Sequence, residues 1–510
     1  MPEARLRQRA PRGPCLRPPQ TEQMRPIGRV FDRTSTGRAD TSHAAFAVMA
    51  AAGGLYCALA ASRMYPLVDG DGLYHFPVAV EWSLGRPLTN PLLLSVLHDP
   101  LSGPDGSRYT YHGFLYALLV GGAARALGGG PTATVGAAYC MHWVASLAAA
   151  LAVFVWADLR GLKRVACAVI LPPSMLALSV AWHGRMESLV IGLVGAAVLA
   201  WRWPGVWRSA VGGLVVSLVF FTSPACGVVG ALVFVAATMW SRQDAQLWTG
   251  LWAATVMALI GAGLCLLVYP FSLTAWVDGV LRHSRSVLAQ PMGRGFVATW
   301  LVRPELPLLA VSVAALAAGT YERLGRVIRP LQGGRRTAVI SVTLLIAAAL
   351  IRLAFVKTEA SYNAVVWMPV SAAVALSHRP PRWCVWAVTV ALVLPALGLA
   401  RSSVILARQF SPHVVGFDEA RTRLHELTPM GCVASSGLWM AADMAGGATT
   451  SGTRPECIVR QQTYTGASRP PELPGYQLVE NRFAPATRLL GIPIARTAGG
   501  WQFAVYARIR

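Results

Sequence analysis

Residues 44–75 read AAFAVMAAAGGLYCALAASRMYPLVDGDGLYH, and this stretch decides the fold class. Its first part, 44–62, is an apolar run of about the 20 residues that a helix needs to cross a bilayer. Its second part, 68–75, is a short polar segment in which glycine separates two aspartates. Together they predict a membrane-spanning helix followed by a loop at the membrane surface.

Similar apolar runs recur along the chain, which is 54% hydrophobic and only 13% charged. Soluble domains contain about 25% charged residues, and disorder requires low hydrophobicity, so both classes are excluded for most of the chain. We therefore predict an all-α polytopic membrane protein. The candidate runs are 44–62, 113–128, 132–156, 165–181, 187–201, 207–221, 224–240, 247–269, 306–320, 337–356, 361–377 and 383–400.

The basic residues predict the orientation. The net charge is +22, but the basic residues lie in short segments between the apolar runs, so we expect no nucleic-acid partner. Cytoplasmic loops of membrane proteins are enriched in Lys and Arg. This rule predicts a disordered, Arg-rich cytoplasmic tail at 1–43 and places 401–510 outside.

These two ends require an odd number of spans, so about eleven of the twelve runs should cross the membrane. The weakest is 113–128, which contains Arg125, and we predict that it is a juxtamembrane or re-entrant helix. A transmembrane domain would then occupy 44–400, with a large first outer loop at 63–131. Residues 401–510 alternate short apolar stretches with Gly, Pro and Thr, which predicts a small extracytoplasmic α/β domain.

Two of the nine cysteines, Cys432 and Cys457, fall in this exterior domain. An oxidising compartment permits a disulfide between them. The alternative is two unpaired thiols in an ordinary core.

The sharpest polar motif is Val68–His75, which contains Asp69 and Asp71. Two neighbouring carboxylates can act as a general base with its partner, or hold a divalent cation such as Mg or Mn. No other cofactor is suggested. The alternative is an Asp-Gly turn that caps the next helix. That helix, 73–84, is expected to be amphipathic and to lie on the membrane, with three apolar residues on one stripe: Phe76, Val80 and Leu84.

The order of motifs after this point resembles the GT-C class of integral membrane glycosyltransferases, in the branch of the aminoarabinose transferases and protein O-mannosyltransferases. The resemblance covers about 44–400. The motifs that carry it are Val68–His75, Gly85-Arg86-Pro87-Leu88, Tyr109–Tyr116, His183-Gly184-Arg185-Met186-Glu187, Thr222-Ser223-Pro224, Tyr269-Pro270-Phe271, Trp276, Arg282-His283-Ser284-Arg285 and Lys357–Asn363.

The resemblance implies a bacterial inner-membrane enzyme that transfers a sugar, with inversion, from a polyprenyl-phosphate donor to an extracytoplasmic glycan, lipid or protein. By position, Asp71 matches the catalytic base of the class. Gly72 stands where the class often has Glu, which makes Asp69 a plausible partner. The donor phosphate would be held by His112, Arg282, His283, Arg285, Arg294, Lys357 and Tyr362.

Each basic residue in this set has an alternative role, because Arg and Lys at a membrane interface extend towards lipid headgroups. Glu187, two residues after Arg185, is expected to form a helix-end ion pair; the alternative is that it lines the membrane cavity. Two other functions remain open: a non-enzymatic lipid or polymer transporter, and an inactive envelope scaffold of the same fold. No nucleotide-binding or zinc motif appears in the sequence.

Overall fold

The computed structural model describes most of residues 41–289 and 369–509. The residues outside its description are 1–40, 66–67, 69, 93–107, 182, 204, 242–243, 290–368, 371, 374–375, 377–381, 413, 445–447, 450–454, 462–471, 483–486, 496–502 and 510.

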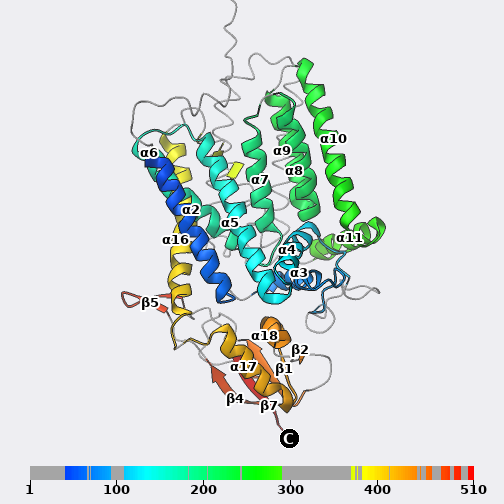
Figure 1. Ribbon diagram of the computed structural model, residues 1–510, viewed down its shortest axis with the longest axis vertical. Coiled ribbons are helices and arrows are strands. Elements are labelled where there is room, and N and C mark those ends of the chain that lie inside the picture. Colours follow the sequence, from blue (N-terminus) through cyan, green and yellow to red (C-terminus); the bar gives the residue numbers. More distant parts are fainter. Residues whose placement is uncertain are drawn as a thin grey trace, which may run out of the picture. The chain divides into compact units, whose positions relative to one another are not determined.

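The described chain is mostly helical (Figure 1). Its long helices are α2 (Thr41–Ser62), α5 (Gly130–Trp156), α6 (Leu162–Val180), α9 (Pro224–Ser241), α10 (Asp244–Val268) and α16 (Arg382–Arg408). Shorter ones are α3 (Phe76–Ser83), α4 (Leu115–Ala126), α7 (Glu187–Ala200), α8 (Trp207–Thr222) and α11 (Leu273–Ala289). Helices α2, α5 and α16 each pack on α6, and α10 packs on α8.

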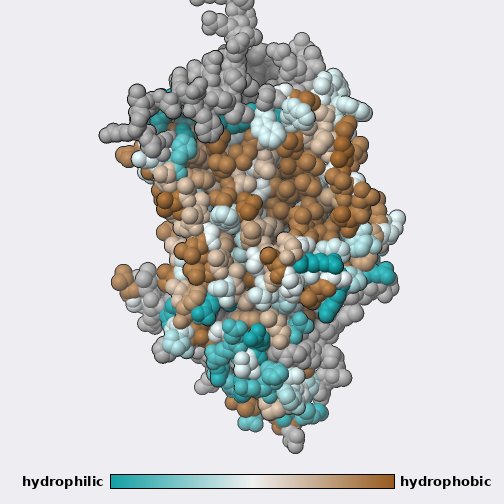
Figure 2. All heavy atoms as spheres, viewed as in Figure 1, coloured by the Kyte–Doolittle hydropathy of each residue, from teal (hydrophilic) through white to brown (hydrophobic). Residues whose placement is uncertain are grey.

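Five segments of the described helices are long and apolar enough to cross a membrane: Thr41–Ser62, Gly130–Trp156, Leu162–Val180, Leu247–Val268 and Val385–Arg408. Figure 2 shows hydrophobic residues gathered over the long helices and hydrophilic residues over the C-terminal region. Large apolar side chains are exposed along α10, including Trp248, Trp252 and Leu267. Such a surface needs a lipid environment, which agrees with a membrane protein.

The predicted apolar runs up to residue 269 each coincide with a helix to within a few residues. Helix α4 replaces the weak run at 113–128, and its 12 residues extend about 18 Å, too short for a hydrocarbon core of about 30 Å. The predicted runs 306–320 and 337–356, and most of 361–377, lie outside the described residues.

The expectation for residues 73–84 was wrong. A 3₁₀ helix, η1 (Gly70–Tyr74), comes first, and α3 starts only at Phe76, with His75 at its N-cap. Phe76 and Val80 are buried inside the protein together with the residues between them, whereas Leu84 is exposed. Phe76 and Val80 therefore lie inside the protein, where α3 packs mainly on α4, and do not face a membrane.

The predicted start of the C-terminal domain at 401 is also too early, because α16 continues to Arg408. Ser403 does not interrupt it, since its hydroxyl donates to the carbonyl of Leu399 one turn back. Ile405 and Leu406 are buried and extend the packed face of the helix.

The C-terminal region contains α17 (Phe417–Leu427), η4 (Thr428–Met430), η5 (Ser436–Leu438), α18 (Trp439–Met444) and a mixed five-stranded sheet. The strand order is β2 (Ala448–Thr449), β1 (Cys432–Ala434), β3 (Cys457–Gln461), β7 (Phe503–Arg508) and β4 (Tyr476–Arg482). β1 runs parallel to β2 and β3, whereas β7 is antiparallel to β3 and β4. A separate hairpin consists of β5 (Thr487–Leu489) and β6 (Ile492–Ala495).

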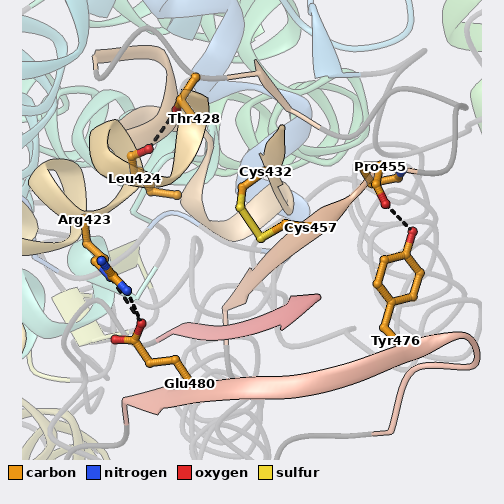
Figure 3. The surroundings of a disulfide bond; sticks show 8 residues. All are labelled: Arg423, Leu424, Thr428, Cys432, Pro455, Cys457, Tyr476 and Glu480. Carbon is orange, nitrogen blue, oxygen red and sulfur yellow. Dashed lines mark hydrogen bonds and ion pairs between the residues drawn. A yellow bond between two sulfur atoms is a disulfide. The ribbon is translucent and has the colours of Figure 1, made fainter. Parts of the chain in front are cut away.

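The predicted disulfide between Cys432 and Cys457 is present (Figure 3). The two residues are direct partners in the parallel pairing of β1 with β3. Their bond therefore links the start of β1 to the start of β3.

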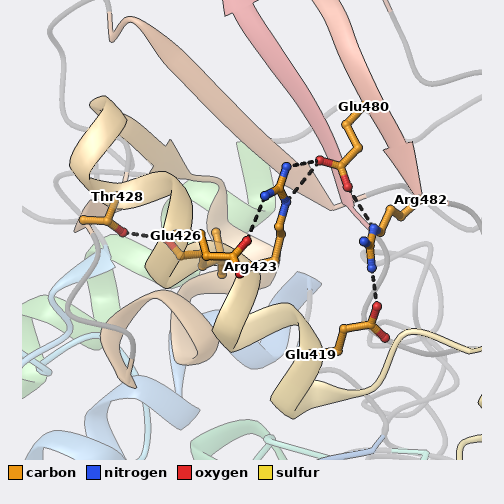
Figure 4. Close-up of polar contacts among 7 residues, drawn as sticks. Glu419, Arg423, Glu426, Thr428, Glu480 and Arg482 are labelled. Carbon is orange, nitrogen blue, oxygen red and sulfur yellow. Dashed lines mark hydrogen bonds and ion pairs between the residues drawn. The ribbon is translucent and has the colours of Figure 1, made fainter.

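Four charged residues join α17 to β4 (Figure 4). The guanidinium of Arg423 donates to Glu480 at 2.7 Å, and Glu480 also accepts from Arg482 at 2.8 Å. Arg482 pairs in turn with Glu419. Burial alone would raise the pKa of Glu480, but the hydrogen bonds from Arg423 and Arg482 outweigh it and hold this pKa below its usual value.

Candidate functional site

The candidate site begins at η1, which contains Asp71 and follows directly on the loop after α2. Two buried polar side chains from later in the chain hold its backbone. The amide of Asn90 donates to the carbonyl of Leu73 at 2.8 Å, and the hydroxyl of Tyr111 donates to the carbonyl of Tyr74 at 3.1 Å. The backbone amide of Leu92 fixes the Asn90 side chain by donating to its oxygen at 3.0 Å. Tertiary contacts therefore hold the backbone of the short helix that contains Asp71 in place.

His75 follows η1 and is almost completely buried. Its Nδ1 atom lies 2.6 Å from the hydroxyl oxygen of Tyr109, and this hydroxyl donates to the carbonyl of Gly113 at 3.2 Å. Because the Tyr109 hydroxyl uses its proton on Gly113, the His75 ring donates to it from Nδ1. Burial, followed by the neighbouring Tyr111, raises the pKa of Tyr109 well above its usual value, so its hydroxyl stays protonated as a donor.

Three imidazole rings lie in sequence from this point. The ring centroids of His75 and His112 are 4.6 Å apart, and those of His112 and His283 are 4.1 Å apart. His283 belongs to α11, so the three rings connect the end of η1 with a helix about 200 residues later in the chain. The sequence prediction included His112 and His283, and the structure brings these two together.

Helix α11 reaches this position through close packing on residues 109–112. The indole of Trp276 donates to the carbonyl of His112 at 2.8 Å, and the hydroxyl of Tyr269 donates to the carbonyl of Tyr109 at 3.0 Å. A Cβ atom at Gly279 would lie 2.4 Å from the carbonyl oxygen of Thr110. Only glycine permits this contact, so Gly279 sets the approach of α11.

The two described arginines of the predicted phosphate set are both exposed on α11. Arg282 forms an ion pair with Asp278 at 3.2 Å, one turn earlier, and such exposed pairs contribute little stability. The remaining members of the set, Arg294, Lys357 and Tyr362, lie outside the described residues, as do Asp69 and the side chain of Asp71.

A second turn, between α6 and α7, packs against η1. A Cβ atom at Gly72 would lie 3.4 Å from the carbonyl oxygen of His183. The ring of His183 stacks on Tyr139 with centroids 4.7 Å apart, and its Nδ1 lies 3.1 Å from Nε2 of His142. Burial lowers the pKa of His183 to about 4, so the ring is neutral at physiological pH.

The ion pair predicted at the start of α7 is confirmed. The guanidinium of Arg185 donates to both carboxylate oxygens of Glu187 at 3.1 Å, and both side chains are buried. Because a buried charge needs a partner, this pair makes the turn costly to rearrange.

Within the described ranges, no group of three or more His, Cys, Asp or Glu residues has an arrangement that could hold a metal ion. A divalent cation was expected at Asp69 and Asp71, but Asp69 and the side chain of Asp71 lie outside the described residues.

Three residues of the site were missed from the sequence: His75, Asn90 and Tyr109. His75 ends the Val68–His75 motif, and its closeness in sequence to two aspartates could have identified it as a site residue. Tyr109 begins the Tyr109–Tyr116 motif, but its contact with His75, 34 positions away, could not be predicted from it. Asn90 gave no signal, because its role depends on a contact with Leu73, 17 positions away.

The chain matches no protein-family model, no curated protein and no solved structure.

Proposed function

We propose that this protein is a membrane glycosyltransferase that transfers a sugar from a polyprenyl-phosphate donor to an extracytoplasmic acceptor. The observation that carries the proposal is the convergence of η1, which contains Asp71, with His75, His112 and His283. This arrangement supports the proposal because it brings the backbone that carries Asp71 close to imidazole rings that could donate hydrogen bonds to a phosphate.

In the proposed reaction the carboxylate of Asp71 accepts the proton of the acceptor's hydroxyl or amino group. The acceptor atom attacks the anomeric carbon, whose bond to the phosphate oxygen breaks with inversion. The released polyprenyl phosphate carries the electron pair of that bond. Imidazole N–H groups and the arginines of α11 would stabilise the developing charge.

We also propose the topology of the protein: about eleven spans in a bacterial plasma membrane, a cytoplasmic N-terminus and an extracytoplasmic C-terminal domain. The disulfide supports this orientation, since such bonds persist in oxidising compartments. The buried network of Asn90 and Tyr111 supports a catalytic role for the turn, because catalysis requires a base with a fixed position.

The test is an Asp71→Asn variant in membrane vesicles supplied with polyprenyl-phosphate sugars. We expect transfer to fall at least 100-fold, within the range of a general base. The matched control is Glu81→Gln, which removes a carboxylate of α3 that pairs with the exposed Arg86. Wild-type transfer by Asp71→Asn would refute the proposal. Lipid flipping without glycan transfer by the wild type would favour a transporter.

A further inference from the structure

A cavity of about 310 Å³ lies where the end of α2 meets the segment between α16 and α17. Its volume is at the lower end of the range for small-ligand sites, about 300 Å³. The residues that line it and carry the argument are Ser62, Arg63, Gln409, Phe410, Asp418 and Glu419.

The cavity lies at a membrane boundary. Helix α2 ends at Ser62 and α16 ends at Arg408, and both contain candidate membrane spans. Figure 1 shows that these two helices approach α17 at the same end, and Figure 2 shows the surface changing there from hydrophobic to hydrophilic. A ligand at this level would share the depth of the lipid headgroups.

The cation of the cavity is Arg63. Its guanidinium carbon lies 4.0 Å from the centre of the Phe410 ring, which orients the planar group. Arg63 forms no ion pair with any residue that the structure describes. A guanidinium held in this way has its forked donors available for a phosphate.

The same cavity is lined by two carboxylates from the first turn of α17. Glu419 is engaged by Arg482, whereas Asp418 is largely exposed and has Arg421 at 3.7 Å, beyond hydrogen-bond distance. A purely anionic headgroup would be attracted by Arg63 and repelled by these carboxylates. A headgroup that also carries a primary ammonium would be attracted by both, since an ammonium offers three donors to carboxylate oxygens.

We propose that this cavity binds the phosphoethanolamine headgroup of phosphatidylethanolamine, with the phosphate at Arg63 and the ammonium at Asp418. Phosphatidylglycerol lacks the ammonium, and the methyl groups of phosphatidylcholine prevent donation from nitrogen. The cavity would thus select a zwitterionic lipid with a primary amine.

The test is native mass spectrometry of the delipidated full-length protein, titrated with dioleoyl lipids of the three headgroups. We expect phosphatidylethanolamine to bind at least tenfold more tightly than the other two. Arg63→Ala should weaken it at least tenfold, Arg63→Lys should weaken it less, and Asp418→Asn should remove the advantage over phosphatidylglycerol. The control is Arg401→Ala, which alters an exposed arginine of α16 outside the cavity.

Equal binding of the three lipids would overturn the proposal, as would unchanged affinity in correctly folded Arg63→Ala and Arg63→Lys. A preference for phosphatidylglycerol that Asp418→Asn leaves unchanged would overturn it in favour of an anionic lipid.

Discussion

The Nδ1 atom of His75 and the hydroxyl oxygen of Tyr109 lie 2.6 Å apart, although 34 positions separate the two residues in the chain. This hydrogen bond joins the end of η1 to the segment on which α11 packs. It therefore connects the region of the proposed base with the region of the proposed phosphate donors.

Tyr109→Phe tests this bond. The substitution would leave His75 Nδ1 and the Gly113 carbonyl without their shared partner, at a cost of about 1–3 kcal/mol. We expect a lower midpoint of thermal unfolding in detergent, together with reduced transfer. The control is Tyr116→Phe, because the buried hydroxyl of Tyr116 has no hydrogen-bond partner among the described residues and its removal should not destabilise. Equal midpoints for the two variants would contradict the role given to Tyr109.

The buried pair of Arg185 and Glu187 should be costly to break from one side. Glu187→Met removes the carboxylate that accepts two hydrogen bonds from the buried Arg185 guanidinium and should destabilise the protein by roughly 3–5 kcal/mol, whereas replacing both residues by Met should cost less. Denaturant unfolding of Arg185→Met, Glu187→Met and the double variant measures this coupling. As a comparison, Glu81→Gln disrupts an exposed pair and should change stability by less than about 1 kcal/mol. Additive effects at Arg185 and Glu187 would show that they do not act as a pair.

Stability should depend on pH through His183. Its pKa is lowered to about 4 in the folded protein, against about 6.5 in an unfolded chain. Because the unfolded state binds the proton first, stability falls as the pH drops from 6.5 towards 4, by roughly 3 kcal/mol in total. His183→Asn should flatten this part of the profile. A profile that His183→Asn leaves unchanged would assign the acid sensitivity to other groups.

The disulfide should stabilise the C-terminal domain. Its two residues are 25 positions apart, and closing a loop of this size contributes about 3 kcal/mol in the entropy model. We expect Cys432→Ser with Cys457→Ser to unfold at a lower temperature, with Cys140→Ser, an exposed free cysteine, as the control. Alkylation under denaturing conditions without reductant should leave Cys432 and Cys457 unmodified. Labelling of both would show that the bond is absent.

Much of the helical framework could be predicted because apolar runs report helices directly. The run 187–201 corresponds to Glu187–Ala200, and 207–221 corresponds to Trp207–Thr222. Hydropathy gave a wrong prediction where an apolar stripe contacts other helices of the protein and not lipid. The stripe of α3 looks the same in sequence whether the helix faces a membrane or packs on α4, so only the packing distinguishes the two.

The sequence by itself determined a helical membrane protein with a small C-terminal sheet domain, and it identified the Cys432–Cys457 pair and the Arg185–Glu187 ion pair. These features follow from local composition, from elimination among nine cysteines and from adjacency in the chain. The grouping of His75 with Tyr109, of His112 with His283, and of Asn90 with η1 was decided only by the tertiary structure. Contacts between residues far apart in the chain leave no periodic signal in the sequence. These residues meet only because α3, α11 and the loop before α4 pack together.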